Sequence, residues 1–289
     1  MRRRVLVSGV LIGACVAGGA VALAIGRSMW NRETARAVAA LPGDTTRLDG
    51  GGEALPNGML DSLPPPVARY FARVLPAERR WIRAATVEWG GEFRMRPGGG
   101  WATFEAVQHF TSRPPGFVWD ARIRMIPLTP VRVRDSYRSG AGTMRARVGG
   151  LVTVVDEGHT PEMAQSALAR WLGEAVWFPT ALLPGRGIHW EAVDDSTARA
   201  TVTDGRVSAT AEFRFAPGGE ITRMTAMRYR DVEGAAVLTP FEGDYGEYVR
   251  HAGVRVPATA EVAWMLPEGR FPYWRGRLVR LDYEFAGAG

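Results

Sequence analysis

The chain begins with a long apolar segment. Residues 5–26 contain no charged side chain, and at about 1.5 Å of rise per helical residue they are long enough to cross a hydrocarbon core of about 30 Å. Arg2, Arg3 and Arg4 precede this segment, and such a basic flank favours retention of the N-terminus in the cytoplasm. We therefore expect residues 1–4 to form a cytoplasmic tail and residues 5–26 a single transmembrane signal anchor.

Two other interpretations of the same segment remain open. Ala22 and Ala24 occupy the positions that a signal peptidase recognises, so the segment also fits a cleaved signal peptide. Residues 12–15, which end in Cys15, loosely match a lipoprotein signal, although the next ten residues stay apolar where a lipoprotein usually turns polar. All three interpretations place the rest of the chain in the cell envelope, outside the cytoplasm.

The next segment is expected to connect the membrane to a folded domain. Residues 27–41 have the composition of a short interfacial helix, and Trp30 lies where an aromatic residue would meet the membrane boundary. The following residues contain Gly and Pro without periodicity, which predicts a flexible tether. We therefore assign residues 27–62 to a juxtamembrane helix and tether that lets the domain move away from the bilayer, and residues 63–286 to an extracytoplasmic β domain.

A short amphipathic helix opens this domain. Val67, Tyr70, Phe71, Val74 and Leu75 recur at the spacing of one helical face. The prolines before them favour a helix start, and the proline after them a helix end. We expect this helix to lie on a sheet.

From residue 84 onward, apolar and polar residues alternate, which predicts half-buried strands. The expected inward positions are the odd-numbered residues of 85–95, 117–125, 207–215 and 279–285 and the even-numbered residues of 258–266. Turn-forming residues separate such runs, for example at 204–205 and 268–269. Roughly ten strands joined mostly by tight turns predict an antiparallel meander.

One apolar helix interrupts the strands midway. Thr160 and Pro161 form a helix start, and Pro179 marks its end. An apolar helix at this point needs a concave sheet face on which to bury itself. The predicted fold class is therefore mainly β (α+β), with a long, strongly curved antiparallel sheet or open half-barrel wrapped around one central helix, and an N-terminal transmembrane helix.

Several segments carry a family resemblance. LPPPVARYFARVLP at 63–76 and RWLGEAVWFPTALLPG at 170–185 are its most specific parts. Together with less specific stretches over residues 63–285, they resemble an uncharacterised bacterial envelope family built on a domain of unknown function. The resemblance implies no activity. At the level of architecture the predicted fold is similar to the lipoprotein-carrier half-barrels of bacterial envelopes, and an analogy of fold does not determine function.

Composition excludes several classes of function. The formal charge is +6, but every basic residue is arginine, and apart from residues 2–4 the arginines alternate with acids, which argues against nucleic-acid binding. Cys15 is the only cysteine, so neither an intrachain disulfide nor a Cys-based zinc site can form. The histidines are His109, His159, His189 and His251, and they have no ligand spacing. We expect no metal and no cofactor.

Glu174 is the residue with the strongest case for chemistry. It lies between Trp171 and Trp177 near the end of the predicted helix, where the helix dipole and burial both disfavour a carboxylate. Residues 228–230, Arg-Tyr-Arg on a later strand, are the first candidates for a compensating cation, and Arg170 is another. We interpret Glu174 as part of a structural ion pair that pins the helix to the sheet. The alternative is a catalytic acid with a raised pKa.

A hydrolase lacks a motif. The sequence offers no Gly-x-Ser-x-Gly elbow, and residues 137–142 fit a hairpin turn instead. Glu174 or His189 could act only with a second group that the sequence does not identify. We name no catalytic residue and keep an unidentified hydrolase as a third hypothesis.

Large aromatic residues share the predicted inward face with many alanines, which leave volume to be filled. Either the central helix fills this volume or an apolar, lipid-like ligand does, with arginines at the mouth for an anionic head group. The first hypothesis is therefore a non-enzymatic envelope carrier, and the second is a scaffold that binds another envelope protein without a small ligand. The expected ligand-binding residues are Trp89, Phe117, Trp119, Trp171, Glu174, Trp177, Trp190, Arg228, Tyr229 and Trp264.

Overall fold

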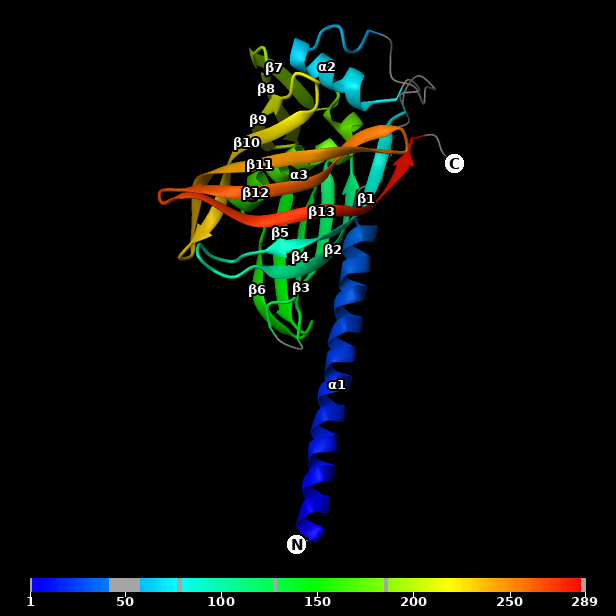
Figure 1. The fold of residues 1–289 in the computed structure, drawn as a ribbon, viewed down its shortest axis with the longest axis vertical. Coiled ribbons are helices and arrows are strands. Elements are labelled where there is room, and N and C mark those ends of the chain that lie inside the picture. Colours follow the sequence, from blue (N-terminus) through cyan, green and yellow to red (C-terminus); the bar gives the residue numbers. More distant parts are fainter. Residues whose placement is uncertain (1, 42–57, 77–79, 127–128, 185–186, 287–289) are drawn as a thin grey trace.

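The computed structural model describes residues 2–41, 58–76, 80–126, 129–184 and 187–286. Within these ranges the chain forms one antiparallel sheet of thirteen strands in the order β6-β5-β4-β3-β2-β1-β13-β12-β11-β10-β9-β8-β7 (Figure 1). The strands are β1 (Ile82–Phe93), β2 (Ala102–Thr111), β3 (Gly116–Ile123), β4 (Val131–Arg138), β5 (Ala141–Val148), β6 (Val152–Gly158), β7 (Ile188–Asp194), β8 (Thr197–Asp204), β9 (Val207–Phe215), β10 (Ile221–Val232), β11 (Ala235–His251), β12 (Val254–Leu266) and β13 (Gly269–Phe285). The first and last strands, β1 and β13, pair with each other in the middle of the sheet. Strands β2 to β6 follow on one side of this pair, and β12 to β7 follow on the other side.

The sheet curves around a central helix, as predicted. Helix α3 (Pro161–Glu174) packs against β4 and β5 on one side and β9 and β10 on the other. The two arms of the sheet meet where the Tyr137 hydroxyl (2.7 Å) and the Gly140 amide (3.2 Å) both donate to the Asp204 carboxylate. The helix start is also confirmed, because the Thr160 hydroxyl accepts from the Met163 amide and Pro161 is the first helical residue.

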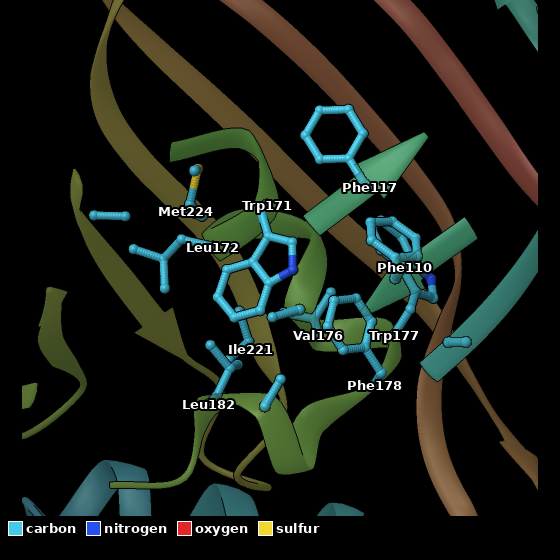
Figure 2. Close-up of a cluster of buried hydrophobic side chains, with 14 of the residues drawn as sticks. Phe110, Phe117, Trp171, Leu172, Val176, Trp177, Phe178, Leu182, Ile221 and Met224 are labelled. Carbon is cyan, nitrogen blue, oxygen red and sulfur yellow. The ribbon is translucent and has the colours of Figure 1, made fainter. Parts of the chain in front are cut away.

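The segment from α3 through two 3-10 turns, η1 (Ala175–Trp177) and η2 (Pro179–Leu182), fills the concave face. Figure 2 shows its large side chains directed into one cluster with residues of the surrounding strands. The members from this segment that are completely buried are Leu168, Leu172, Val176, Phe178 and Leu182. Full burial of such a side chain contributes about 1.5–3 kcal/mol, so this segment, which we call the plug (residues 161–183), is a main part of the core.

Helix α2 (Pro65–Val74) covers one end of the sheet and packs against β8 and β12. The amphipathic pattern is confirmed, because Val67, Tyr70, Phe71 and Val74 are all fully buried. The Tyr70 ring meets Phe215 of β9 edge-on, with the ring centroids 6.0 Å apart.

Most of the alternation predicts inward positions correctly, with two exceptions. Met95 is 71% exposed because β1 already ends at Phe93. Val279 is 66% exposed because Glu88 pairs with Arg280 and Trp89 with Leu278, which leaves Val279 as the extra residue of a β-bulge. A bulge reverses the alternation beyond it, and no residue pattern in the sequence announces this one.

The N-terminal helix α1 (Arg2–Ala39) is continuous, so the expected juxtamembrane helix is its C-terminal part and not a separate element. Among the residues that the structure describes, no helix combines the length and the apolarity needed to cross a membrane. Residues 42–57 of the expected tether lie outside the described ranges. Beyond them, Met59 and Leu60 pack against the core.

Trp30 is covered by the sheet, whereas the sequence predicted an aromatic residue in contact with the membrane boundary. It is fully buried against the outer face of the sheet, and its indole N–H donates to the Asp120 carboxylate at 2.9 Å. The guanidinium groups of Arg132, Arg134 and Arg147 lie over the ring, with that of Arg134 at 4.7 Å from the centroid. Three cations and one hydrogen bond therefore dock α1 on the outer face of β3–β5.

Glu33 completes this contact. Its carboxylate accepts from Arg134 at 3.1 Å and from Arg147 at 2.9 Å. Burial by itself would raise the pKa of Glu33, but the hydrogen bonds and charges of these two arginines hold it below its usual value. The C-terminal part of α1 is therefore fixed to the sheet by packing and by charge.

Replacement of Trp30 by alanine should release this part of α1 from the sheet. Removal of a buried Trp costs about 3–5 kcal/mol, and here the loss falls on the docking of α1. Tryptic cleavage after Arg32 and Arg36 in the purified full chain should become at least about tenfold faster, since a change of 1.4 kcal/mol in local opening corresponds to a factor of ten. Mass spectrometry of a digestion time course measures this cleavage rate. Met29→Ala, at the neighbouring and half-exposed position, should leave the rate unchanged, and equal rates in the two variants would contradict the docking.

Candidate ligand-binding site

A chain of polar side chains joins the plug to the inner wall of the sheet. Arg170 Nε donates to Glu174 Oε1 at 3.0 Å, and Arg170 Nη1 donates to Asp135 Oδ2 at 2.5 Å. The other oxygen of Glu174 accepts from Gln108 Nε2 at 2.8 Å. The Trp89 indole N–H in turn donates to Gln108 Oε1 at 3.2 Å. The chain therefore links α3 with β1, β2 and β4.

Local structure explains these contacts. Arg170 and Glu174 are four residues apart on α3 and so lie on the same side of the helix. Gln108 and Asp135 point inward from their strands. Gln108 shares the inner face of β2 with Phe104, Ala106 and Phe110, and Asp135 shares that of β4 with Val131, Val133 and Tyr137. A polar residue at an inward position of an alternating strand is the pattern in the sequence that could have identified them.

Burial and charge act against each other here. Burial raises the pKa of Glu174, and the Arg170 guanidinium and the Gln108 amide offset only part of this rise. For Arg170, burial lowers the pKa, but the charges of Glu174 and Asp135 more than compensate and hold it above its ordinary value. Arg170 is thus a permanent cation shared by two carboxyl groups, and burial favours the protonated form of Glu174.

Arg228 is the second buried cation on this face. Its side chain lies over the rings of Phe241 (4.5 Å) and Trp264 (5.6 Å), and Nε donates to the Ser166 carbonyl oxygen of α3 at 3.1 Å. Only 9% of Arg228 is exposed. Among the described residues it forms no ion pair with a carboxylate. Burial raises the pKa of Tyr273, and the charges of Arg228 and Arg170 offset part of the rise.

Aromatic rings line the inner face between and around the two arginines. One series of contacts runs from Trp177 on the plug through Trp89, Trp274 and Phe104 to Trp119. A second series joins Phe93, Tyr273, Trp264 and Phe241. Together these nine side chains form what we call the aromatic array; Trp264, Tyr273 and Trp274 among them are partly exposed.

Trp119 has an unusual feature within the array. It is 5% exposed, Arg170 lies 5.1 Å from its ring centroid, and its indole N–H is buried. In the part of the chain that the structure describes, this N–H has no hydrogen-bond partner. Buried donors are nearly always paired in folded proteins, so the site contains a donor that a ligand could satisfy.

The structure brings most of the expected ligand-binding residues to this region. Those on or beside the aromatic array and the polar chain are Trp89, Phe117, Trp119, Glu174, Trp177, Arg228 and Trp264. Gln108, Asp135, Tyr273, Trp274 and Phe104 belong to the same region and were not expected.

Three expected residues lie elsewhere. Trp171 packs against Phe178 and donates to the Thr111 carbonyl oxygen, and Trp190 packs against Phe213 and donates to the Leu182 carbonyl oxygen. These two tryptophans are therefore satisfied core residues. The Tyr229 backbone exchanges hydrogen bonds with the Ser166 hydroxyl, so its role is to hold α3.

Two sources of a partner for Glu174 were expected, residues 228–230 and Arg170. Arg170, on the same helix, is the arginine that binds it, while Arg228, one of the first candidates, binds the α3 backbone instead. The interpretation of Glu174 as part of an ion pair that pins the plug is otherwise consistent with its contacts to Arg170 and Gln108.

Glu174 and His189, the two residues considered for a hydrolase, have different surroundings among the described residues. The His189 side chain is 74% exposed on β7, and a carboxylate, that of Glu191, lies 3.9 Å from it. Glu174 is engaged on the inner face with Arg170 and Gln108. In the described ranges no three His, Cys, Asp or Glu side chains gather at a distance suited to a metal ion.

A second hollow, of about 400 Å³, lies on the outer face beside the C-terminal end of α1. Arginines line it, but Arg134 is paired with Glu33 and Arg145 with Asp156. The charges of these two arginines are therefore already compensated, and the inner face remains the candidate site.

Comparisons with known proteins find one matching family and several similar solved structures. The family of unknown function DUF6544 matches residues 53–276, which confirms the family resemblance expected from the sequence. No curated protein sequence matches the chain.

Similar solved structures come from several bacteria. A LolA-superfamily protein from Nitrosomonas europaea aligns with 10% identity and a TM-score of 0.35 over 76% of this chain and 92% of its own. A DUF1329 protein from Desulfovibrio piger aligns with 10% identity and a TM-score of 0.39 over 72% and 88%. A β-barrel-like DUF1849 protein from Brucella abortus aligns with 11% identity and a TM-score of 0.27 over 71% and 99%.

Removal of the shared cation should damage the fold more than neutralisation of Glu174. Arg170→Met leaves two carboxyl groups buried without their partner and should lower the free energy of unfolding by about 3–5 kcal/mol. Glu174→Gln leaves one acceptor oxygen for Arg170 and turns an NH2 group toward the Gln108 amide, so it loses one hydrogen bond and should lower the free energy of unfolding by only about 1–3 kcal/mol at neutral pH. Urea unfolding followed by tryptophan fluorescence measures both. Arg199→Met, which breaks an exposed pair with Glu212, is the control, and a loss for Arg170→Met no larger than for this control would contradict the assignment.

The raised pKa of Glu174 predicts a pH dependence with a definite sign. A carboxyl group with a higher pKa in the folded state than its usual 4.5 binds more protons when the chain is folded. Its contribution to stability is therefore complete below that value and is lost as the pH rises through the folded pKa. The free energy of unfolding of the wild type, minus that of Glu174→Gln, should fall as the pH rises from about 4.5. If this difference in the free energy of unfolding increased with pH instead, the charge of Arg170 would outweigh burial in its effect on the pKa of Glu174.

Proposed function

The chain belongs to the DUF6544 family of unknown function, and we propose that its β domain binds an elongated apolar molecule with an anionic head group, as a non-enzymatic carrier of the cell envelope. The observation that carries this proposal is Arg228, a nine-tenths buried cation that has no acidic partner among the described residues. Buried charges in proteins are paired, and a carboxylate or phosphate of a ligand would supply the missing partner.

The surroundings of Arg228 supply the apolar part of such a site. Trp264 and Tyr273 stack with their centroids 6.0 Å apart, and both remain partly exposed beside the guanidinium group. An alkyl chain on these rings would gain about 0.8 kcal/mol for each buried CH2 group. The Trp119 indole N–H offers a further hydrogen bond to a polar atom of the ligand.

Arg170 and Arg228 have different roles on this face. Arg170 is neutralised by Glu174 and Asp135 and holds the plug. Arg228 binds the plug only through the backbone oxygen of Ser166, so its charge is available to a ligand. An anion at Arg228 therefore adds a charge pair to the site without breaking the ion pairs that fix α3.

The proposed location of the protein rests on the N-terminal segment. We propose that residues 5–26 anchor the chain in the cell membrane as a single pass with the N-terminus in the cytoplasm, so that the β domain lies outside it. A carrier mounted in this way would exchange its ligand with the membrane nearby.

Binding can be measured by energy transfer from tryptophan to a dansyl-labelled long-chain fatty acid, with the full chain in lipid nanodiscs and empty nanodiscs as the blank. Arg228→Met should weaken binding of the acid by about tenfold or more, since a charged hydrogen bond is worth about 1.5–3 kcal/mol. The corresponding dansyl-labelled alcohol should lose much less affinity in this variant.

Trp264→Ala separates the apolar contribution from the charge, because it should weaken the acid and the alcohol alike. Arg199→Met, an exposed arginine of β8, serves as the matched control and should bind both probes like the wild type. The absence of saturable binding of either probe to the wild type would refute the carrier and leave a scaffold for another envelope protein as the better hypothesis.

A further inference from the structure

Helix α1 leaves the sheet at the end formed by the β3–β4 connection and the β5–β6 turn. Gly26 of α1 and Gly150 of the turn touch through their backbones. A Cβ atom on Gly26 would lie 2.8 Å from the Gly149 oxygen, and one on Gly150, whose φ is +77°, would lie 2.7 Å from the Gly26 oxygen. From this contact α1 runs on beyond the sheet toward the N-terminus (Figure 1). This point therefore fixes how the helix emerges from the domain.

Exposed apolar side chains gather around the same contact. We call the following residues the rim: Leu23 and Ile25 of α1, Ile126 of the β3–β4 connection, and Leu151 and Val152 at the β5–β6 turn. Leu23 and Leu151 adjoin Gly149 and Gly26 respectively. Val152, at 63%, is the most exposed of the five. A soluble surface rarely carries such side chains together.

The position of the rim along α1 identifies what covers it. The uncharged run ends at Gly26, and the residues from 5 to 26 extend over about 32 Å at 1.5 Å per residue, close to the thickness of a hydrocarbon core. Arg27 follows immediately and is exposed, as is Arg32 one turn further. With the run across the bilayer, the rim lies at the outer boundary of the acyl chains and these arginines lie at the depth of the phosphates.

The inner face of the sheet connects the rim to the candidate site. Val152 pairs with Val148, Val148 with Val131, Val131 with Ile123, and Ile123 with Phe104. Directly paired residues of adjacent strands lie on the same face, and Phe104 and Ile123 face the core. A continuous apolar row therefore crosses the inner face from β6 to β2. It ends at Phe104, which stacks on Trp274 of the aromatic array.

We propose that this end of the sheet rests on the outer surface of the membrane, with the rim side chains among the acyl chains of the leaflet. The β6 end of the apolar row then lies at the bilayer, and the ligand is a membrane lipid or fatty acid whose chain moves along this row without crossing water. This inference rests on the proposed carrier function and on the membrane anchor. The docking of Trp30 and Glu33 holds the domain in this orientation.

The contact can be tested with an environment-sensitive label on single cysteines of the full chain in nanodiscs. In a Cys15→Ser background, NBD attached to Val152→Cys should emit at shorter wavelength and be quenched by lipids that carry a spin label on the acyl chain. The control is Val193→Cys on β7, an exposed valine that lies far from the emerging end of α1 (Figure 1). Its label should behave as in water.

An NBD label on the native Cys15 tests the membrane anchor separately from the contact of the rim with the membrane. If Cys15 is quenched by the acyl-chain spin label while Val152 behaves like Val193, the anchor stands and the contact of the rim with the membrane is refuted. If Cys15 is not quenched either, the anchor fails and the inference fails with it. The fatty-acid titration described above reports on the carrier function independently of both results.

The route of the ligand has a kinetic test. Val152→Asp should slow transfer of the dansyl fatty acid from donor vesicles to the protein by at least about tenfold, because a carboxylate is unfavourable among acyl chains. Its equilibrium affinity for the probe delivered from solution should change by less than about twofold, since residue 152 lies outside the binding site. Val193→Asp should alter neither quantity. Equal transfer rates for the two variants would overturn the proposed route.

Discussion

The inner face of a strongly curved sheet must be covered, and in this protein the plug covers it. Small side chains make the close approach possible: Ala198, Ala200, Ala209 and Ala211 of β8 and β9 are almost completely buried, and α3 packs against β9 and β10. The alanines therefore mark where the helix lies and not where a ligand would fit. The rings of the array lie on the other strands, β1, β2, β3, β11, β12 and β13, and on the plug itself.

Covering the face with a helix brings charge into the interior. Arg170 enters with α3, and it is balanced by Glu174 on the same helix and by Asp135 on the sheet. Each of these groups has a hydrogen-bonded partner, as burial requires. Arg228 departs from this rule because it donates to a backbone oxygen and lies over aromatic rings, and none of the described carboxylates pairs with it. The presence or absence of a carboxylate partner distinguishes the structural role of Arg170 from the binding role proposed for Arg228. The sequence around each arginine does not distinguish them as clearly.

The sequence predicts the elements well where one local pattern decides them. The alternation in β3 and β9, the amphipathic face of α2 and the start of α3 are all confirmed. Contacts that depend on strand register are different. The sequence offered both a distant strand and Arg170 as partners of Glu174, and it ranked the distant strand first, while the helix itself supplies the partner. Trp30 was expected at a membrane boundary because nothing local shows that arginines of β4 and β5 converge on it.

The docking of Trp30 changes what the N-terminal segment can do. A flexible tether would let the domain sample many orientations, whereas a helix packed on β3–β5 sets one. An amphiphile with its head group at Arg228 would then lie on the aromatic array, and the row from Phe104 to Val152 would be the path of its chain between this site and the leaflet. Along this path the chain remains in contact with apolar surface, so no CH2 group has to be hydrated at about 0.8 kcal/mol each during exchange. Rigid mounting and an apolar route therefore favour the same function, namely exchange of a lipid between this site and the membrane that anchors the chain.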